Sequence, residues 1–180
     1  MMSKTRHKSH APASSVLQTL ARPAVMVARD MPADHFVEEH AHDWSQLAYS
    51  SDGLLAVYTE MGSWMAPPER GVWIPAGTNH SCYTPHGAKF RSLHIDRCQF
   101  EDRMDLPDSC CVITISPLLR ELLRHAGDIP LEYDLEGPDG RVMGVIMDLL
   151  GRAERAPLHL PWPTDPRLAR VAEALMEDPA

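Results

Sequence analysis

The chain has 180 residues, of which 44% are hydrophobic and 6% aromatic, and its formal net charge is −8 at pH 7. This composition is typical of one globular domain with a sizeable core. The acidic balance disfavours a nucleic-acid surface, because phosphate contacts need clustered Lys and Arg. No apolar stretch approaches the roughly 20 residues of a membrane span, and no export signal begins the chain. We therefore expect a soluble, cytoplasmic protein that binds no membrane.

The first half of the chain predicts a mostly β fold. Residues 1–22 mix Lys, Arg, His, Ser and Pro without hydrophobic periodicity, which predicts a flexible tail. Over 23–115, short apolar runs alternate with turn residues. The predicted strands are 24–29, 44–49, 54–59, 63–65, 71–74, 80–83, 90–95 and 110–115. Hairpin turns at Asp52-Gly53 and Met61-Gly62 indicate antiparallel pairing, so we expect a jelly-roll β-barrel.

Three histidines and a glutamine in this region have the pattern of a metal site. Side chains at i and i+2 of a strand share a face, so His40 and His42 can direct two imidazoles to one point, and Gln46 has the same parity. His80 ends a Pro-x-Gly turn and can add a third nitrogen. These ligands suit Zn, Ni, Fe or Cu rather than Mg or Ca. Ordered water or an organic effector would satisfy the same polar groups.

Beyond residue 115 the hydrophobic period changes from two to about 3.6. Residues 116–156 are predicted to form a helical segment, with helices at 116–126, capped by Ser116, and at 139–154. The second helix is apolar around more than half of its circumference, as in helices that pack on two sides. We expect a homodimer through these two helices, and burial of both faces within one monomer is the alternative.

The end of the chain predicts a linker followed by another helix. Residues 157–164 are rich in proline, as linkers often are. Residues 165–180 carry apolar side chains at helical spacing from Leu168 onward. Because an amphipathic helix of this length needs an apolar surface to pack on, we interpret it as the start of a truncated domain.

Two segments of the chain resemble the cupin superfamily. The first cupin motif is matched by His40, His42, Gln46 and Gly53, and the second by Gly71, Pro75, Gly77 and His80. The glycine that leads the first motif is absent, and the neutral Gln46 replaces its carboxylate. Since an amide oxygen is a weaker ligand without charge, a metal would be held less tightly than by three His and one Glu.

Together with the Pro-Trp-Pro-Thr-Asp-Pro-Arg-Leu segment at 161–168, these motifs resemble AraC-type transcriptional regulators over residues 24–180. The resemblance implies an N-terminal cupin at 23–115 that senses an effector and dimerises. It also implies that 165–180 begin a helix-turn-helix domain, and that DNA binds only through the missing remainder of that domain. The effector, small molecule or metal, would alter how the dimer presents its DNA-binding units.

The effector pocket is expected at the mouth of the barrel. Candidates for its wall are Trp44, Tyr58, Arg70 and Trp73, and Arg70 can bind a carboxylate bidentately. The alternative for each of the four is a packing or rim position. His94, on the predicted strand 90–95, is a further candidate for a polar contact in the interior.

A metal-dependent cupin enzyme of the dioxygenase or isomerase type is the competing interpretation, since a metal with an open position can bind substrate or oxygen. No second carboxylate or nucleophile stands at motif spacing, and only Glu38 could approach the site as a general base. We therefore expect no catalytic residues and a sensor rather than an enzyme. A third possibility is a structural dimerisation module with vestigial histidines and a collapsed barrel.

Overall fold

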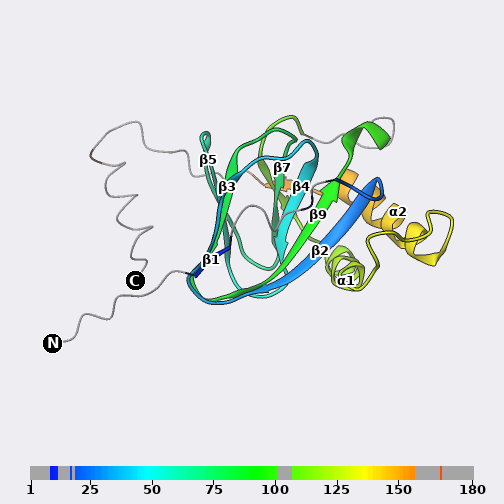
Figure 1. The fold of residues 1–180 in the computed structure, drawn as a ribbon, viewed down its shortest axis with the longest axis horizontal. Helices are drawn as coiled ribbons and strands as arrows, with labels where there is room; N and C mark the ends of the chain where they lie inside the picture. The colour runs from blue at the N-terminus through cyan, green and yellow to red at the C-terminus, as the bar shows by residue number, and fades with distance from the viewer. Residues whose placement is uncertain (1–8, 12–16, 18, 101–106, 157–166, 168–180) are drawn as a thin grey trace.

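The computed structural model describes residues 9–11, 17, 19–100, 107–156 and 167, and they form two opposed β-sheets, two α-helices and a short 3-10 helix at Arg97–Gln99 (Figure 1). One sheet contains, in spatial order, β1 (Ser9–Ala11), β3 (His35–His40), β8 (His80–Thr84), β5 (Leu55–Thr59) and β6 (Gly62–Ala66). The other contains β11 (Arg155–Ala156), β10 (Cys111–Thr114), β7 (Arg70–Ile74), β4 (Ser45–Ser50), β9 (Ala88–Ile95) and β2 (Ala24–Met31). The pairs are antiparallel except β1 with β3, so the mostly β, cupin-like prediction is confirmed.

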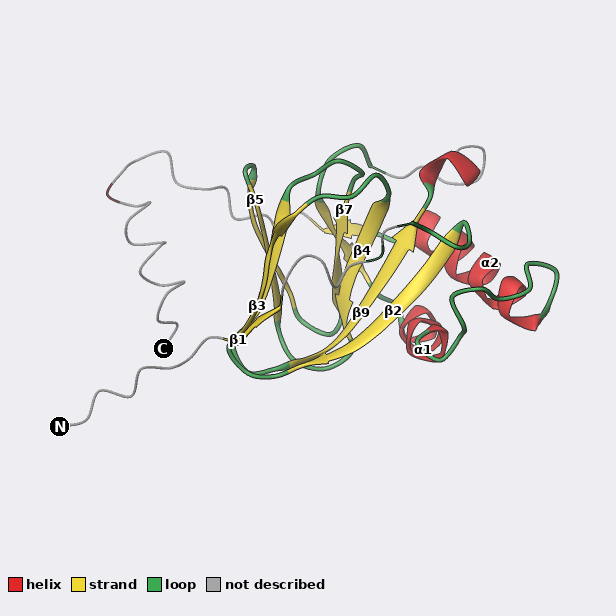
Figure 2. Cartoon of the chain, in the orientation of Figure 1, coloured by secondary structure: helices red, strands yellow, loops and turns green. Residues whose placement is uncertain are grey.

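The helices α1 (Pro117–Ala126) and α2 (Pro138–Gly151) cover the outer face of the six-stranded sheet (Figure 2). Ser116 caps α1 as predicted, because its Oγ accepts a hydrogen bond from Leu119 N at 3.2 Å. The second helix ends before the predicted residue 154, because Arg155 and Ala156 pair with β10. Within the described residues, neither helix has the length and hydropathy of a membrane span.

The six-stranded sheet is buried on both faces, and its strands alternate between two cores. Leu47, Trp73 and Leu93 face the helices, whereas Val72 and Ile74 pack in the barrel interior. All six residues of β4 are buried for this reason. The sheet therefore separates a helix-side core from a barrel-side core.

Three strands are not foreseen by the sequence. The short β11 lies in the segment 116–156 that is expected to be helical. β3 has an exposed acidic pair, Glu38 and Glu39, so its apolar run is too short to stand out. β1 lies within residues 1–22, where a flexible tail is expected, and it pairs with β3 through backbone bonds that need no hydrophobic pattern. The predicted linker at 157–164 lies outside the described residues, as does the predicted helix at 165–180 apart from Arg167.

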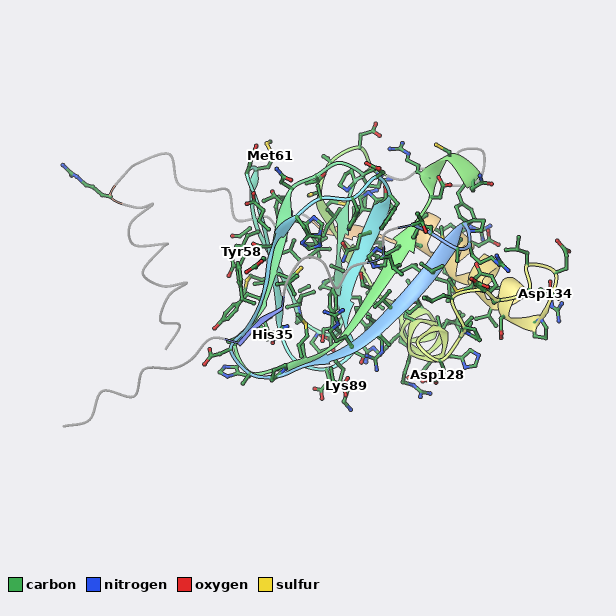
Figure 3. All side chains as sticks on the ribbon, viewed as in Figure 1. His35, Tyr58, Met61, Lys89, Asp128 and Asp134 are labelled. Atoms are coloured by element: carbon green, nitrogen blue, oxygen red, sulfur yellow. The ribbon has the colours of Figure 1, made fainter. Side chains whose placement is uncertain are left out.

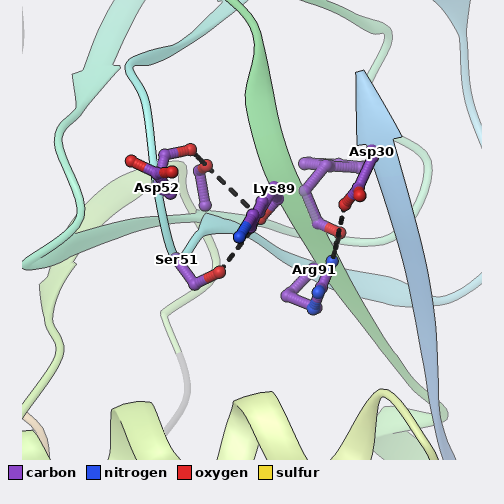
Figure 4. A network of polar contacts seen from close by, with 7 residues as sticks. Asp30, Ser51, Asp52, Lys89 and Arg91 are labelled. Atoms are coloured by element: carbon purple, nitrogen blue, oxygen red, sulfur yellow. Dashed lines mark hydrogen bonds and ion pairs between the residues drawn. The ribbon is translucent and has the colours of Figure 1, made fainter. Parts of the chain in front are cut away.

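Two turns that cross between the sheets close one end of the barrel. Ser51 N donates to Lys89 O at 3.0 Å, and Lys89 N donates to Asp52 O at 2.9 Å. The side-chain hydroxyl of Ser51 also lies against Lys89 (Figure 4). Gly53 has φ +83°, and a Cβ there would lie 2.1 Å from Gly87 O. A larger residue at position 53 would therefore push the turns apart. The histidines lie at the other end, where β4 and β8 begin.

Candidate functional site

Three histidines converge at the open end of the barrel. His40 ends β3 and is paired with His80, the first residue of β8, across a register shift between Val37 and His40. His42 lies beyond the strand, so the predicted i, i+2 strand geometry is replaced by a bulge and a turn that give the same convergence. One nitrogen from each of the three rings lies within 4.8 Å of the others.

Backbone carbonyls fix the orientation of all three rings. The Nδ1 atoms of His40, His42 and His80 lie 2.8, 2.8 and 2.9 Å from the carbonyl oxygens of Glu38, Trp44 and Thr78. Because a carbonyl oxygen only accepts, each Nδ1 carries the hydrogen, and in a neutral ring Nε2 keeps a lone pair. This second contact is typical of histidines that bind a metal through Nε2.

The Pro-x-Gly turn supports this arrangement. Gly77 has φ +73°, a conformation that glycine adopts without strain. Its N donates to His42 O at 2.9 Å, and Thr78 N donates to Pro75 O at 3.3 Å. The second cupin motif therefore positions the backbone of His42 as well as the ring of His80.

Burial favours the neutral form of two of the three rings. Burial, followed by the charges of His40 and His42, lowers the pKa of His80 to about 4. Burial also lowers the pKa of His40. Neutral imidazole is the form that binds metal ions, so no proton competes for these nitrogens at neutral pH.

A hydrogen-bond chain extends from His42 into the barrel. Gln46 Oε1 lies 2.8 Å from His42 Nε2, and Gln46 Nε2 donates to Ser92 Oγ at 2.7 Å. Ser92 Oγ lies 3.0 Å from His94 Nε2, and Trp44 Nε1 donates to His94 Nδ1 at 2.8 Å. Burial, followed by the charges of the other histidines, lowers the pKa of His94 to about 3. His94 thus makes the polar interior contact expected of it.

The donor set fits a transition-metal ion. His80 Nε2 is buried and has no hydrogen-bond partner among the described residues. His42 Nε2 and Gln46 Oε1 face each other as two acceptors. A cation bound by three imidazoles and one amide oxygen would satisfy these lone pairs, and this set matches Zn, Ni, Fe or Cu.

A cavity of about 400 Å³ adjoins the centre. Its polar wall comes from the chain just described, and the rest is largely apolar. The lining includes His40, Gln46, Ser92 and His94, the β2, β3, β8 and β9 residues Val27, Arg29, Met31, Val37, Cys82 and Phe90, and Gly127, Ile129, Pro130 and Leu131 after α1. The volume lies in the range of small-molecule sites.

The model of the AraC-like ligand-binding domain family matches residues 22–138. The chain belongs to this family. HTH-type transcriptional regulator NimR of Escherichia coli (strain K12) is 30% identical over 140 residues, which are 78% of this chain and 50% of NimR. The chain therefore spans about half the length of this curated relative.

Apo ToxT from Vibrio cholerae strain SCE256 shares the fold, with a TM-score of 0.51 and 7% identity over 87% of this chain and 65% of that one. At this identity the likeness concerns the fold alone. The family match and the NimR match together show that the chain contains an AraC-like ligand-binding domain.

The AraC-like domain brings together only some of the predicted site residues. Trp44 stacks on His42 with ring centroids 5.2 Å apart and an interplanar angle of 7°. Trp73 instead faces the helices, where it is fully buried and its Nε1 donates to Pro107 O at 2.9 Å. Trp73 alternates with the interior residues Val72 and Ile74, so its parity directs it away from the cavity.

Tyr58 and Arg70 also lie away from the cavity of the AraC-like domain. Tyr58 follows the interior residue Val57 on β5, in the sheet opposite the helices (Figure 3), and burial raises its pKa to about 12. Arg70 donates to Thr114 Oγ1 and lines a separate hollow near the start of α1.

Several residues of the cavity wall were not predicted from the sequence. Arg29, Cys82 and Phe90 occupy interior positions of their strands, which the period-two pattern would have indicated once the strand bounds were known. Ile129 and Leu131 come from the loop after α1 and reach the cavity around the free edge of β2. No local pattern reveals that contact.

Proposed function

We propose that this domain senses a small molecule in its 400 Å³ cavity and controls a DNA-binding transcriptional regulator. The observation that supports this best is the cavity itself, because it joins polar groups of the barrel to the loop after α1. No Asp or Glu lines its described wall, whereas Arg29 does. A neutral or anionic, mostly apolar effector fits this wall better than a cation does.

The second part of the proposal is that His40, His42, His80 and Gln46 hold a divalent transition metal. The three rings would bind through Nε2, and Gln46 through its amide oxygen. When bound, the metal would supply a Lewis-acidic anchor for an effector oxygen or nitrogen. Trp44 packs flat against His42 and shields that ring from water.

Elemental mass spectrometry on tag-free protein tests the metal centre. The parent is expected to carry close to one metal ion per chain, and His40→Ala and His80→Ala are expected to lose it. His86→Ala is the matched control, because His86 is exposed on the turn after β8. A metal-free parent under non-chelating conditions would contradict the metal centre and leave the histidines as lining of an organic-effector pocket.

The third part is a homodimer formed through α1 and α2. Leu118 is 58% exposed on α1 and Val145 is 46% exposed on α2, on helices whose inner sides are buried against the sheet. Burying such side chains against a second copy would remove apolar area from water. DNA contacts are assigned to residues outside this acidic domain.

Analytical ultracentrifugation tests the dimer. Leu118→Glu and Val145→Glu are expected to weaken self-association at least tenfold, because each would place a charge in the interface. Met61→Glu serves as control, since Met61 is 76% exposed on the turn between β5 and β6, which belong to the sheet opposite the helices (Figure 3). Equal dissociation constants for all three variants would refute this interface.

A metal-dependent cupin enzyme is the alternative to a sensor. One assay distinguishes the sensor from the enzyme: the metal-loaded chain is incubated with small molecules that bind to it. A sensor returns each bound molecule unchanged. Turnover that the His80→Ala variant lacks would contradict the sensor proposal.

A further inference from the structure

The side-chain amide of Gln46 lies between two partners that make different demands on it. Its Oε1 is 2.8 Å from His42 Nε2, and its Nε2 donates to Ser92 Oγ at 2.7 Å. An amide keeps nearly the same shape after a half-turn about its last side-chain bond. Two orientations of Gln46 therefore fit between the same neighbours.

The orientation in this structure, with the oxygen toward His42, suits an occupied metal centre. His42 Nδ1 donates to Trp44 O at 2.8 Å, so Nε2 of the neutral ring has a lone pair and no hydrogen. A lone pair facing a carbonyl oxygen at 2.8 Å is unfavourable unless a cation attracts both. Both atoms are ligands in the proposed metal centre, on which this inference rests.

The opposite orientation suits a centre without metal. The Gln46 amide N–H then donates to His42 Nε2, and its Oε1 accepts the Ser92 hydroxyl hydrogen. The rest of the chain agrees with this direction, because Trp44 Nε1 donates to His94 Nδ1 at 2.8 Å. His94 Nε2 therefore carries a hydrogen and donates to Ser92 Oγ at 3.0 Å. In this orientation every polar side-chain atom of the hydrogen-bond chain from Trp44 to His42 has a partner, and no ion is needed.

We propose that the Gln46 amide turns over when a metal ion enters the three-histidine centre, and that this turn changes the wall of the effector cavity. With the oxygen toward the metal, Ser92 Oγ accepts hydrogens from both Gln46 and His94. The Ser92 hydroxyl then no longer donates its hydrogen to Gln46 Oε1, so this hydrogen is available to another acceptor. All three residues line the cavity, so the wall gains a donor. Metal and an effector that carries an acceptor there favour the same orientation and bind cooperatively.

Glutamine is essential to this switch because a carboxylate has no hydrogen to donate. Gln46→Glu cannot form the metal-free orientation, and it adds a charged ligand to the centre. The glutamine therefore makes metal binding weaker than a carboxylate would, and it allows occupancy to be reported through Ser92. The departure from the cupin motif becomes a functional feature.

Nuclear magnetic resonance of the labelled 180-residue chain during titration with Zn²⁺ tests the turn directly. The Gln46 side-chain amide hydrogens are expected to show Overhauser contacts to the His42 ring without zinc, and to the Ser92 β-hydrogens at saturation. Unchanged contacts at saturation would overturn the switch and leave the metal centre intact. Absence of zinc binding would overturn both. This measurement needs no variant, so it does not depend on the folding of a mutant.

Zinc affinity, measured by competition with a chromophoric chelator, gives an independent result. Gln46→Glu is expected to bind zinc at least about tenfold more tightly than the parent, because the carboxylate adds a charged ligand next to the cation. Gln99→Glu makes the same chemical change at an exposed position and is expected to match the parent. Equal affinity for Gln46→Glu and the parent would contradict the role assigned to the amide.

Discussion

The two faces of the six-stranded sheet are both buried, yet they carry different kinds of side chain. On the helix side, Leu47, Leu93 and Ile146 are buried without measurable exposure in a continuous apolar core. On the barrel side, the same strands present Gln46, Ser92 and other polar groups to a cavity of about 400 Å³. Along one strand, residues that pack against the helices therefore alternate with residues that line the cavity.

This difference shows that the barrel side of the sheet can accommodate polar binding groups, whereas the helix side cannot. In the barrel, Gln46 is compensated by Ser92 at 2.7 Å, whereas His80 Nε2 has no hydrogen-bond partner among the described residues. The helix side is filled by close contacts and contributes the stability that a hollow barrel lacks. We infer that α1 and α2 are needed for folding of the sensing domain as well as for the proposed dimer.

The comparison is tested most strongly by large-to-small changes on β9. Leu93→Ala, on the helix side, is expected to lower the free energy of unfolding by about 2–5 kcal/mol, because it leaves a void in a filled core. Phe90→Ala, on the cavity wall, is expected to cost less, because Phe90 already borders empty space. Urea denaturation of both variants measures the difference. A larger loss for Phe90→Ala would contradict the assignment of the two faces.

Acidification is expected to destabilise the metal-free domain through the buried histidines on the barrel side of the sheet. His80 and His94 have pKa values of about 4 and about 3 in the folded chain, below the ordinary value of 6.5. Above pH 6.5 both states are neutral and stability is unaffected. Below it the unfolded chain binds protons that the folded chain does not, so stability falls as pH drops toward 4, by up to about 1.4 kcal/mol per pH unit for each group.

Thermal unfolding between pH 7 and pH 4, in the presence of a chelator, measures this dependence. His94→Gln is expected to flatten the curve because it removes one of the buried histidines with a lowered pKa. His86→Ala, at an exposed turn, is expected to leave the slope as it is in the parent. A slope that stays the same in His94→Gln would contradict the role given to burial.

The sequence predicts the convergence of the three histidines and the cupin-like β fold because both depend on short-range spacing. His40, His42, Gln46 and His80 stand in motifs whose turn residues are themselves in the sequence. The cap at Ser116 is predicted for the same reason. Local chemistry is sufficient for each of these features.

The effector wall is only partly predictable, because it depends on which face of a strand is turned inward. In a sheet buried on both sides, apolar and aromatic residues occupy both faces, so Trp73 gives no sign of its direction. β3 is missed because Glu38 and Glu39 interrupt its pattern. The loop residues Ile129 and Leu131 reach the cavity only through tertiary structure.

Two tryptophans give the finest test of the comparison, because each donates its indole N–H to a partner on one side of the sheet. Trp73→Phe leaves Pro107 O without its donor in the packed helix side, and it is expected to cost about 1–3 kcal/mol of stability in urea denaturation. Trp44→Phe leaves His94 Nδ1 without its donor beside the cavity. Because water in the cavity can replace that donor, we expect Trp44→Phe to lose less than half as much stability as Trp73→Phe. We also expect the Trp44→Phe variant to lose zinc to a chelator more readily than the parent. Equal stability losses with unchanged zinc retention would mean that the two faces do not divide packing from binding.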